Sequence, residues 1–326
     1  MRAIVISAPG GPEVLELVER PIPEPAAGEV LIRIRAFGLN RAELFTRQGD
    51  SGPAVPFPRI IGIECVGEVV SAPGTDLREG QKVAAMMGGM GRSFDGSYAE
   101  YTRVPRVSVF PVETGLDWAT FGALPEMFQT SNGSLTTGLR IAAGQTLLVR
   151  GGTSSIGLTS ASIAHQRGLT VIATTRNPAK ADAMKAVGVD HVLVDPGGSL
   201  VELVREISPG GVDRVLDLVG TTTLRDSLLC CCDGGIVCMT GILGGEWVWD
   251  GFQPFLDVPN GVFLTSYGGG SEDVTAEQLQ AFVSAVEAGE APSNLDRTFT
   301  LEEIVDAHRF MEANRAKGKL VVVVES

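Results

Sequence analysis

Residues 151–157, with the sequence GGTSSIG, are nearly all small, which suits the binding of phosphate groups. Phosphate oxygens reach backbone N–H groups only where no side chain holds them away, and a helix N-terminus adds favourable partial charge. The spacing approximates the dinucleotide pattern GxGxxG, with Ser154 where the middle glycine is expected. A purely structural turn is the alternative. We therefore expect a dinucleotide to contact Gly151, Gly152, Thr153, Ser154, Ser155 and Ile156.

A second group of residues with binding chemistry follows the next apolar run. Dinucleotide domains that prefer NAD place an acidic residue at the end of this strand, where it binds the ribose hydroxyls. Here the run ends Thr174-Thr175-Arg176-Asn177, and the next carboxylate is Asp182. Arginine can bind a 2′-phosphate through a bidentate fork. We therefore expect NADPH, held by Thr175, Arg176 and Lys180, although these two cations could also be ordinary solvated charges.

The elements that must position these residues form a βαβ unit. Leu147-Leu148-Val149 predicts a buried strand, a helix follows the glycine-rich turn, and residues 170–174 predict the next strand. Further strands are expected over residues 191–195, 213–219, 236–240 and 262–267, with helices over 178–187, 199–207 and 222–232. Six strands suit a doubly wound sheet, which binds ligands at the carboxyl ends of its strands. Further cofactor contacts are therefore expected at Val219, Gly241, Ile242, Leu243, Ser266 and Tyr267.

The flanking regions have a different pattern. Residues 1–124 contain short runs of alternating polar and apolar residues, divided by glycine and proline, which predict a partly open β-barrel. Helices are expected over residues 118–124, 128–137 and 275–288. The tail contains a predicted strand over 297–300, a helix over 301–314 and a strand over 319–324. We expect this tail to pack on the N-terminal region, which gives one domain from residues 1–124 and 268–326 and another from 125–267.

Composition excludes several classes of function. The 326 residues carry a net charge of −13 and no evident basic patch, which argues against nucleic acid as a partner. No apolar run approaches the roughly 20 residues of a membrane span. The first residues resemble a strand and show no signal-peptide pattern. Five cysteines, three of them adjacent, do not form a disulfide framework, so we expect a cytoplasmic protein.

Several short motifs, spread over nearly the whole chain, resemble one protein family. They are FGLNRAEL at residues 37–44, RQG at 47–49, GIE at 62–64, GSYAEY at 96–101, the turn at 151–157 and GKLV at 318–321. Together they look like the zinc-independent quinone oxidoreductase branch of the medium-chain dehydrogenase/reductase superfamily. The resemblance implies an α/β fold, with a Rossmann doubly wound parallel sheet and a GroES-like, partly open β-barrel catalytic domain. It also supports a homodimer joined through the dinucleotide domains at the apolar run Val262-Phe263-Leu264.

The residues present argue against a metal. Zinc-dependent relatives carry a cysteine in the segment of Asn40 and a histidine at the position of Ile63, and neither residue here ligates zinc. Residues 86–115 also lack the four cysteines of a structural zinc site. Cys65 and the run Cys230-Cys231-Cys232, expected on a helix, suit buried positions better than a metal site. The three histidines, His165, His191 and His308, are not expected to be catalytic.

The resemblance also suggests individual site residues. It places Asn40 near nicotinamide and substrate, as a catalytic and cofactor-binding residue; a turn asparagine with satisfied hydrogen bonds is the alternative. Arg47 is a catalytic candidate at a cleft or else a surface salt bridge. Thr130 matches a cofactor contact or a helix start, and Asn314 matches an asparagine that reaches the cofactor. Asn132 stands where many relatives have an aromatic residue.

Two further features leave alternatives open. Relatives often place a tyrosine where this chain has Asp195, whose carboxylate would weaken phosphate binding if it faced the pocket. Trp247, Trp249 and Phe252 could form a stacking wall for a flat substrate, a dimer contact or part of the core. The resemblance implies an NADPH-dependent reductase of small quinones or related α,β-unsaturated carbonyls. The alternatives are an enoyl or 2-alkenal reductase and a non-catalytic NADPH-binding structural protein.

Overall fold

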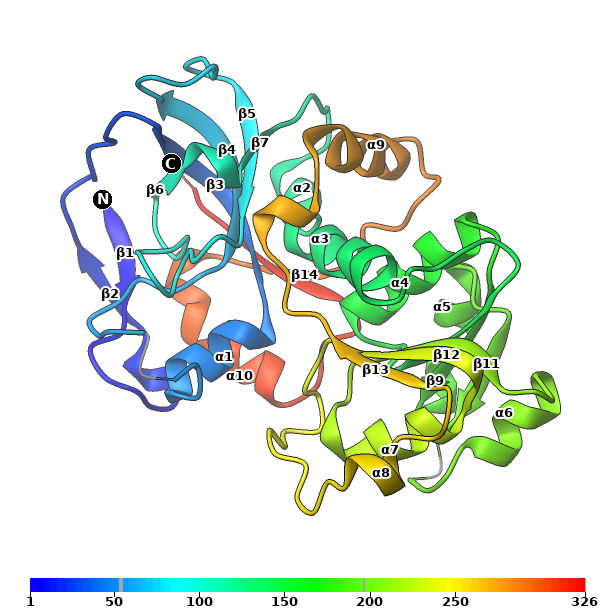
Figure 1. Ribbon diagram of the computed structural model, residues 1–326. Helices are drawn as coiled ribbons and strands as arrows, with labels where there is room; N and C mark the ends of the chain where they lie inside the picture. Colours follow the sequence, from blue (N-terminus) through cyan, green and yellow to red (C-terminus); the bar gives the residue numbers. More distant parts are fainter. Residues whose placement is uncertain (53–54, 196, 326) are drawn as a thin grey trace. The chain divides into compact units, whose positions relative to one another are not determined.

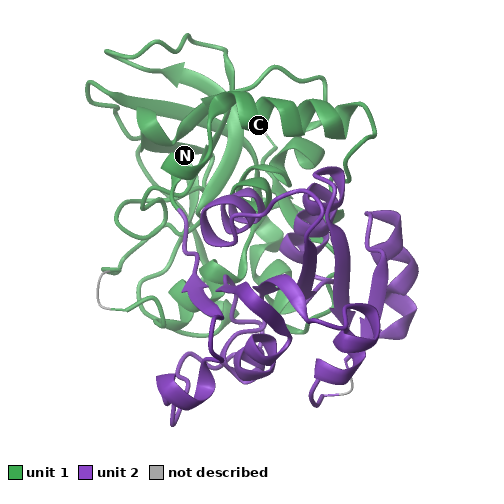
Figure 2. Cartoon of the chain, turned by 45° about the vertical axis from the view of Figure 1, so that its right-hand side comes forward, with its two compact units in different colours: residues 1–129, 270–326 green, residues 130–269 purple. Residues whose placement is uncertain are grey.

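The structure, a computed structural model, describes residues 1–52, 55–195 and 197–325. The chain forms two compact units, which Figure 2 shows in different colours. We call residues 1–129 with 270–326 the split unit, and residues 130–269 the central unit. The sequence predicted these boundaries at 124/125 and 267/268. The first one lies later: the helix α3 (Pro125–Gly133) begins at the predicted position, and the observed boundary falls inside this helix.

The central unit is built on a parallel sheet of six strands (Figure 1). The strands are β8 (Thr146–Arg150), β9 (Thr170–Thr175), β10 (His191–Val194), β11 (Val212–Asp217), β12 (Cys231–Met239) and β13 (Phe263–Ser266). Their order is β10-β9-β8-β11-β12-β13, and every neighbouring pair is parallel. This order confirms the predicted doubly wound sheet, in which the chain direction across the sheet reverses beside β8.

Helices connect the strands of the central unit and cover the sheet. They are α4 (Ser155–Gln166), α5 (Ala181–Ala186), α6 (Val201–Ile207), α7 (Thr221–Leu229) and α8 (Pro254–Asp257). Leu148, Ile172 and Val215 pack with Val204 of α6 and Leu228 of α7 in one buried apolar cluster. The inner strands β8 and β9 form here because their apolar runs are buried, as the centre of a parallel sheet requires. The loops at the carboxyl ends are thereby fixed to a rigid frame.

The split unit contains mainly antiparallel strands. They are β1 (Arg2–Val5), β2 (Glu16–Glu19), β3 (Glu29–Leu39), β4 (Glu64–Ser71), β5 (Lys82–Met86), β6 (Tyr101–Pro105), β7 (Val109–Pro111), β14 (Leu295–Phe299) and β15 (Lys319–Val323). Strands β14-β15-β3-β4-β5-β7 pair in this order, β6 pairs with β3, and β1 pairs with β2. The long strand β3 thus bonds to three neighbours, which gives the GroES-like, partly open barrel that the sequence predicts.

The tail of the chain contributes to this same unit. The split unit contains the helices α1 (Arg41–Gln48), α2 (Trp118–Gly122), α9 (Ala276–Glu287) and α10 (Ile304–Glu312), of which α9 and α10 come from the tail. Strand β15 bonds antiparallel to β3, with Val321 opposite Gly38. Leu320 and Val322 of β15 share one buried apolar cluster with Ile32 of β3. The predicted return of residues near the C-terminus to the N-terminal region is therefore observed.

One predicted helix is wrong at its end. The cysteine run was expected to continue the helix over residues 222–232, but α7 ends at Leu229 and Cys231 begins β12. Cys231 pairs with Val212 at the start of β11, and the register shifts between Val212 and Arg214. The partner strand decides the conformation here, because the run itself has no strong helix or strand preference. All five cysteines are unpaired thiols.

Candidate functional site

The glycine-rich turn after β8 is shaped by close packing. A Cβ atom at Gly152 would lie 2.8 Å from Cβ of Ala173 in β9. A Cβ atom at Gly157 would lie 2.6 Å from the carbonyl oxygen of Gly151. The turn is also bonded to the end of β9, because the Gly152 N–H donates to the Thr174 carbonyl over 3.1 Å. Only glycine at positions 152 and 157 allows this approach of turn, helix and strand.

Ser154 takes a structural role at the position where a glycine is usual. It is the N-cap of α4, where its hydroxyl accepts from the Gly157 N–H over 3.1 Å and donates to the Gly151 carbonyl over 2.9 Å. The backbone N–H groups of Thr153, Ser155 and Ile156 donate to no other residue within the described part of the chain. Three unpaired donors at the start of a twelve-residue helix are suited to hold an anionic group.

The turn after β9 presents two cations. The buried Thr175 hydroxyl bonds to the Asn177 N–H and carbonyl, each over 3.0 Å, and so fixes this turn. Arg176 is exposed and Lys180 half-buried. Neither side chain has a hydrogen-bond or ion-pair partner among the residues that the structure describes. Both are therefore available to a ligand that carries negative charge.

Asp195 is neutralised by a residue that the sequence analysis did not single out. Arg150, the last residue of β8, is 1% exposed, and its guanidinium lies 3.3 Å from the Asp195 carboxylate and 2.7 Å from that of Asp226. The Asp195 carboxylate therefore has a cation of its own beside it. This pairing offsets the repulsion of a phosphate that the sequence led us to consider. The only available signal was an arginine directly before the first glycine of the turn.

The ends of the other strands supply a second part of the same sheet edge. Asp217, the buried last residue of β11, accepts from the N–H groups of Val219 and Gly220, each over 2.9 Å. Leu243, after β12, lies beside the glycine-rich turn, 3.1 Å from where a Cβ of Gly151 would be. The carboxyl ends of parallel strands meet at one edge. The structure thus brings Val219, Gly241, Ile242, Leu243 and Ser266 to the edge that carries the turn.

Three further predicted residues of the central unit have structural contacts. Tyr267 is buried against α3, where its hydroxyl oxygen would lie only 1.8 Å from a Cβ at Gly133. Thr130 lies inside α3, which begins at Pro125, so it is not a helix start. The buried Asn132 amide oxygen accepts from Arg167 over 2.7 Å. Asn132 therefore serves packing rather than an open surface.

The aromatic residues Trp247, Trp249 and Phe252 follow β12, and they differ in burial. Trp249 packs against the buried cluster of the central unit, and its ring lies 4.5 Å from that of Phe252 between centroids, tilted by 39°. The Arg225 guanidinium lies 5.7 Å from the Trp249 ring centroid. Trp247 is 49% exposed. The core interpretation therefore fits Trp249 but not Trp247.

In the split unit, Asn40 lies in a buried polar cluster. Its amide nitrogen donates to Glu43 over 3.2 Å and to Glu64 over 3.1 Å. Its amide oxygen accepts from the Lys319 ammonium. Lys319 also contacts the carboxylates of Glu64, over 2.7 Å, and Glu126, over 3.1 Å. Both amide hydrogens of Asn40 are therefore donated to residues of the protein, and its side chain cannot donate to a substrate in this arrangement.

This cluster joins the segments that carry the family resemblance. Asn40 follows β3, Glu64 begins β4 and Lys319 begins β15. A Cβ at Gly38 would lie 2.3 Å from a Glu64 carboxylate oxygen and 2.5 Å from Cε of Lys319, so only glycine fits there. Sequence reasoning missed Lys319 and Glu126 because their partners are far away in the chain. The GKLV motif was the only signal for Lys319.

Burial sets the charge state of the cluster. Burial raises the pKa of Glu43 to about 7, although Lys319 and the Asn40 amide oppose the shift. Burial also raises the pKa of Glu64, again opposed by Lys319. For Lys319, burial disfavours the ammonium, but the charges of Glu64 and Glu126 outweigh it and raise its pKa. The ammonium therefore stays charged, while burial favours the protonated forms of Glu43 and Glu64.

Arg47 lies at neither of its two predicted positions. It is completely buried, and its guanidinium donates to the Gly10 carbonyl over 3.1 Å and to His308 Nδ1 over 3.0 Å, and pairs with Glu312. Burial and Arg47 lower the pKa of His308 to about 3, so its neutral ring donates from Nε2 to the Tyr98 hydroxyl over 3.0 Å. We therefore assign Arg47 to the core of the split unit and not to a cleft or the surface.

Asn314 is bonded to Arg41, the residue next to Asn40 in the sequence. It adopts a left-handed backbone conformation at φ 54°, which asparagine tolerates, and its amide oxygen accepts from Arg41. Arg41 directly follows Asn40 at the start of α1. The Asn314 amide nitrogen makes no hydrogen bond within residues 1–52, 55–195 and 197–325. It remains a donor that a cofactor could use.

No group of three or more histidine, cysteine, aspartate or glutamate side chains in the described part of the chain could hold a metal ion. No described helix is long and apolar enough to cross a membrane.

Family models and solved structures now identify the class of protein. The family model for the alcohol dehydrogenase GroES-like domain matches residues 26–114, and that for the zinc-binding dehydrogenase domain matches residues 187–322. The chain belongs to the medium-chain dehydrogenase/reductase superfamily, in its zinc-independent quinone oxidoreductase branch. It is therefore an oxidoreductase of this superfamily.

Individual relatives match the chain over its full length. A quinone oxidoreductase of Pseudomonas aeruginosa is 28% identical, and a 2-haloacrylate reductase of Burkholderia sp is 27% identical, with 99% of each chain covered in both cases. A mycobacterial protein solved in complex with NADPH superposes with a TM-score of 0.87 at 26% identity, covering 99% of both chains.

Proposed function

We propose that the protein is an NADPH-dependent oxidoreductase that reduces quinones by hydride transfer without zinc. The observation that carries the proposal is the pair of cations after β9, Arg176 and Lys180, which have no partner among the described residues. They follow a strand end that lacks the carboxylate typical of NAD-binding domains. The neutralised Asp195 and the NADPH complex of a relative give further support.

The residues of the central unit fit this cofactor. The free N–H groups of Thr153, Ser155 and Ile156 would hold the pyrophosphate, and Arg176 and Lys180 would hold the 2′-phosphate. Val219, Gly241, Ile242, Leu243 and Ser266 would line the remainder of the site at the strand ends. When bound, the reduced nicotinamide supplies the hydride. The protein then has to orient the acceptor and exclude water.

In the split unit we propose positioning roles. Lys319, Glu64 and Glu43 fix both ends of the Asn40 amide. Asn40 is thus held rigidly, and it would contact cofactor and substrate as a fixed polar surface rather than as a proton donor. Asn314 retains an amide nitrogen that would donate to the cofactor. A quinone suits such a site because it accepts hydride readily and needs orientation more than acid catalysis.

The proposal is tested by following the nicotinamide absorbance of NADPH with chelator-treated protein. The acceptors are a simple benzoquinone, a 2-alkenal, an enoyl thioester and a 2-haloacrylate. We expect the highest kcat/KM with the quinone, unchanged after chelation. Faster turnover of an alkene would establish the second candidate, a reductase of activated C=C bonds, which the 2-haloacrylate reductase relative supports. NADPH binding without turnover of any acceptor would favour the non-catalytic alternative.

We also propose that the protein works in the reducing cytoplasm. All five cysteines are unpaired, and burial raises the pKa of Cys230 and of Cys231 to about 12. Such thiols are protonated and unreactive at neutral pH. A free-thiol titration of protein purified without reductant from cytoplasm should find five thiols per chain.

A further inference from the structure

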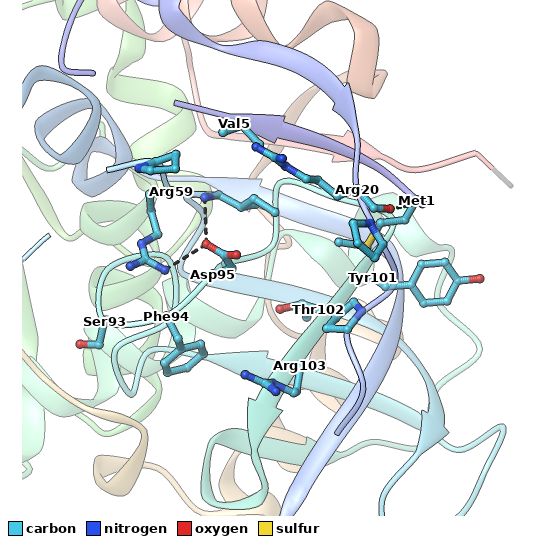
Figure 3. Close-up of a pocket in the computed structure, with 15 residues that line it drawn as sticks. Met1, Val5, Arg20, Arg59, Ser93, Phe94, Asp95, Tyr101, Thr102 and Arg103 are labelled. Carbon is cyan, nitrogen blue, oxygen red and sulfur yellow. Dashed lines mark hydrogen bonds and ion pairs between the residues drawn. The ribbon is translucent and has the colours of Figure 1, made fainter. Parts of the chain in front are cut away.

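The split unit contains a pocket that the proposed reaction does not use. It has a volume of about 530 Å³, within the range of small-molecule sites. Its walls come from the N-terminal strand, the proline-rich segment, and three further stretches, and Figure 3 shows how they surround it. The lining residues are Met1, Val5, Arg20, Pro21, Pro23, Pro58, Arg59, Ile60, Ser93, Phe94, Asp95, Gly96, Tyr101, Thr102 and Arg103. The dinucleotide-binding turn belongs to the other unit.

The lining is positively charged, although the protein carries a net charge of −13. Three arginines, Arg20, Arg59 and Arg103, face one acidic residue, Asp95. Arg59 already pairs with Asp95 over 3.0 Å, and Asp95 also accepts from the Ile60 N–H over 3.1 Å, contacts that Figure 3 marks. Arg103 pairs with Glu29, which does not line the pocket, so the charge of Arg20 is left in excess at the pocket wall.

Arg20 and one end of the Arg103 guanidinium remain available for a ligand. Arg20 is exposed, and its guanidinium has no partner in the part of the chain that the structure describes. Arg103 is 44% exposed; its Nε forms an ion pair with Glu29 over 3.4 Å and its Nη1 donates to the Glu24 carbonyl over 3.2 Å. Its Nη2 is the group left for a ligand among the described contacts. In Figure 3 its side chain extends toward the Phe94 ring. An anion with an apolar body could therefore reach a guanidinium and a ring together.

Two buried polar atoms of the lining lack a partner. Thr102 is 2% exposed, and its hydroxyl makes no hydrogen bond to the described residues; nor does Nε of Arg59. Both atoms have essentially no accessible surface, so a ligand in the pocket cannot bond to them. The charged groups of the arginines that line the pocket are donors only, because a guanidinium has no acceptor. The pocket therefore favours a ligand that accepts hydrogen bonds.

The remaining walls are apolar. Val5, Ile60 and Phe94 contribute aliphatic and aromatic surface, and three prolines contribute rigid rings. A phosphate ion would leave this surface exposed to water, whereas a carboxylate on a flat ring would cover it. Carboxylates also match the planar fork of arginine. The walls and the charges together select one chemical class.

We propose that this pocket binds a small aromatic carboxylate, with the carboxylate at Arg20 and Arg103 and the ring against Phe94. Arg20 and the Nη2 group of Arg103 would attract the negative charge of such a ligand. The proposal is independent of the reaction, because it concerns residues of the split unit outside the site described above.

Calorimetric titration with benzoate tests the proposal, using no NADPH and no acceptor. We expect saturable binding of one benzoate per chain, and at least about tenfold weaker binding of the neutral isostere benzamide. Arg103→Gln and Arg20→Gln should each weaken benzoate binding about tenfold, since each removes one charge-assisted contact. Arg78→Gln, at an exposed arginine outside the pocket, is the matched control and should change nothing.

Thr102→Val is a second control inside the pocket lining. Valine keeps the shape and removes the unpaired hydroxyl, so the free protein should melt at a higher temperature. Its affinity for benzoate should match wild type, because the hydroxyl is not accessible from the pocket. Benzamide or inorganic phosphate binding as tightly as benzoate would overturn the proposal. It would equally be overturned by no saturable binding, or by Arg20→Gln and Arg103→Gln variants that both bind benzoate like wild type.

Discussion

Lys319 shows how much one residue can determine in this fold. Its ammonium is 2% exposed and contacts Asn40, Glu64 and Glu126, while Glu43 bonds to the same asparagine. Buried charges are tolerated only when they are paired and fully hydrogen-bonded. The stability of the cluster therefore depends on this single cation, and a change to the cluster should alter the free energy of unfolding.

Removing the ammonium should destabilise the protein strongly. Lys319→Met leaves two buried carboxylates without their cation, which typically costs about 3–5 kcal/mol. Urea unfolding of the variant should show this loss in the free energy of unfolding. Lys317→Met, which changes an exposed lysine two residues earlier, should stay within about 0.5 kcal/mol of wild type. Equal stability of the two variants would contradict the arrangement.

Glu43 should make stability depend on pH. Its pKa rises from 4.5 to about 7 on folding, so the native state holds a proton that the unfolded state has lost. The stabilisation is complete below about pH 4.5 and is lost as pH rises through about 7, a difference of roughly 3 kcal/mol. Glu43→Gln removes this titration. Its free energy of unfolding should therefore fall less than that of wild type between about pH 5 and about pH 8.

The control separates this effect from packing. Glutamine also places an amide where the carboxylate accepts three N–H groups, so the variant should be less stable at every pH. Only the slope with pH reports the proton. Glu16→Gln, at an exposed glutamate, should keep the wild-type slope. A slope in Glu43→Gln equal to that of wild type would show that Glu43 is already ionised when folded.

At the scale of elements, the turn between β8 and α4 is fixed by backbone contacts rather than side chains. Gly151 has φ 80°, and Gly157 leaves no room for a Cβ beside Gly151. Ser154 caps the helix from within the turn. The free N–H groups of Thr153, Ser155 and Ile156 are thereby pre-organised for an anion, and the conformation of the turn should govern cofactor affinity.

Gly157→Ala should therefore impair NADPH binding. The new methyl would lie 2.6 Å from a backbone oxygen and 2.8 Å from Cα of Gly152, so the turn or the helix must move. We expect at least about tenfold weaker NADPH binding by fluorescence titration, with a lower melting temperature. Gly210→Ala, where nothing lies within 4 Å, should match wild type in both measurements. Unchanged affinity in Gly157→Ala would place the phosphate elsewhere.

At the scale of the whole molecule, β13 leaves an apolar sheet edge. Phe263 is 61% exposed and Leu264 37%, and β13 ends the sheet order. Natural proteins rarely leave such an edge open. We propose a homodimer in which β13 pairs with its copy across a two-fold axis. Phe263→Lys should then yield monomers by light scattering, and Val107→Lys should not. A monomeric wild type at micromolar concentration would contradict the proposal.

The sequence predicted this fold well where local pattern suffices. The six strands of the central unit and the return of the tail to the N-terminal region follow from apolar periodicity and from glycine and proline positions. The end of α7 and the burial of Arg47 do not. Cys231 takes its conformation from β11, and Arg47 finds its partners at Gly10, His308 and Glu312. Such long-range pairings leave no periodic signal in one sequence.

The same limit applies to the candidate site. The turn at residues 151–157 and the cations at Arg176 and Lys180 were predicted from spacing and charge. Arg150 and Lys319 were not, because each is defined by carboxylates that are distant in the chain. Lysine and arginine usually lie at the surface. Their burial follows only from the assembled unit.

The central claim is that this protein is a quinone reductase in which Arg176 binds the 2′-phosphate of NADPH. The preference for NADPH over NADH tests it most directly. The measurement is kcat/KM for NADPH and for NADH, with a benzoquinone at saturation, in wild type, Arg176→Ala and Lys185→Ala. Lys185 is an exposed lysine of α5 and the matched control. We expect wild type and Lys185→Ala to prefer NADPH. Arg176→Ala should lower that preference about ten- to a hundredfold through KM for NADPH, with NADH unaffected. Equal effects on both cofactors, or none, would contradict the account.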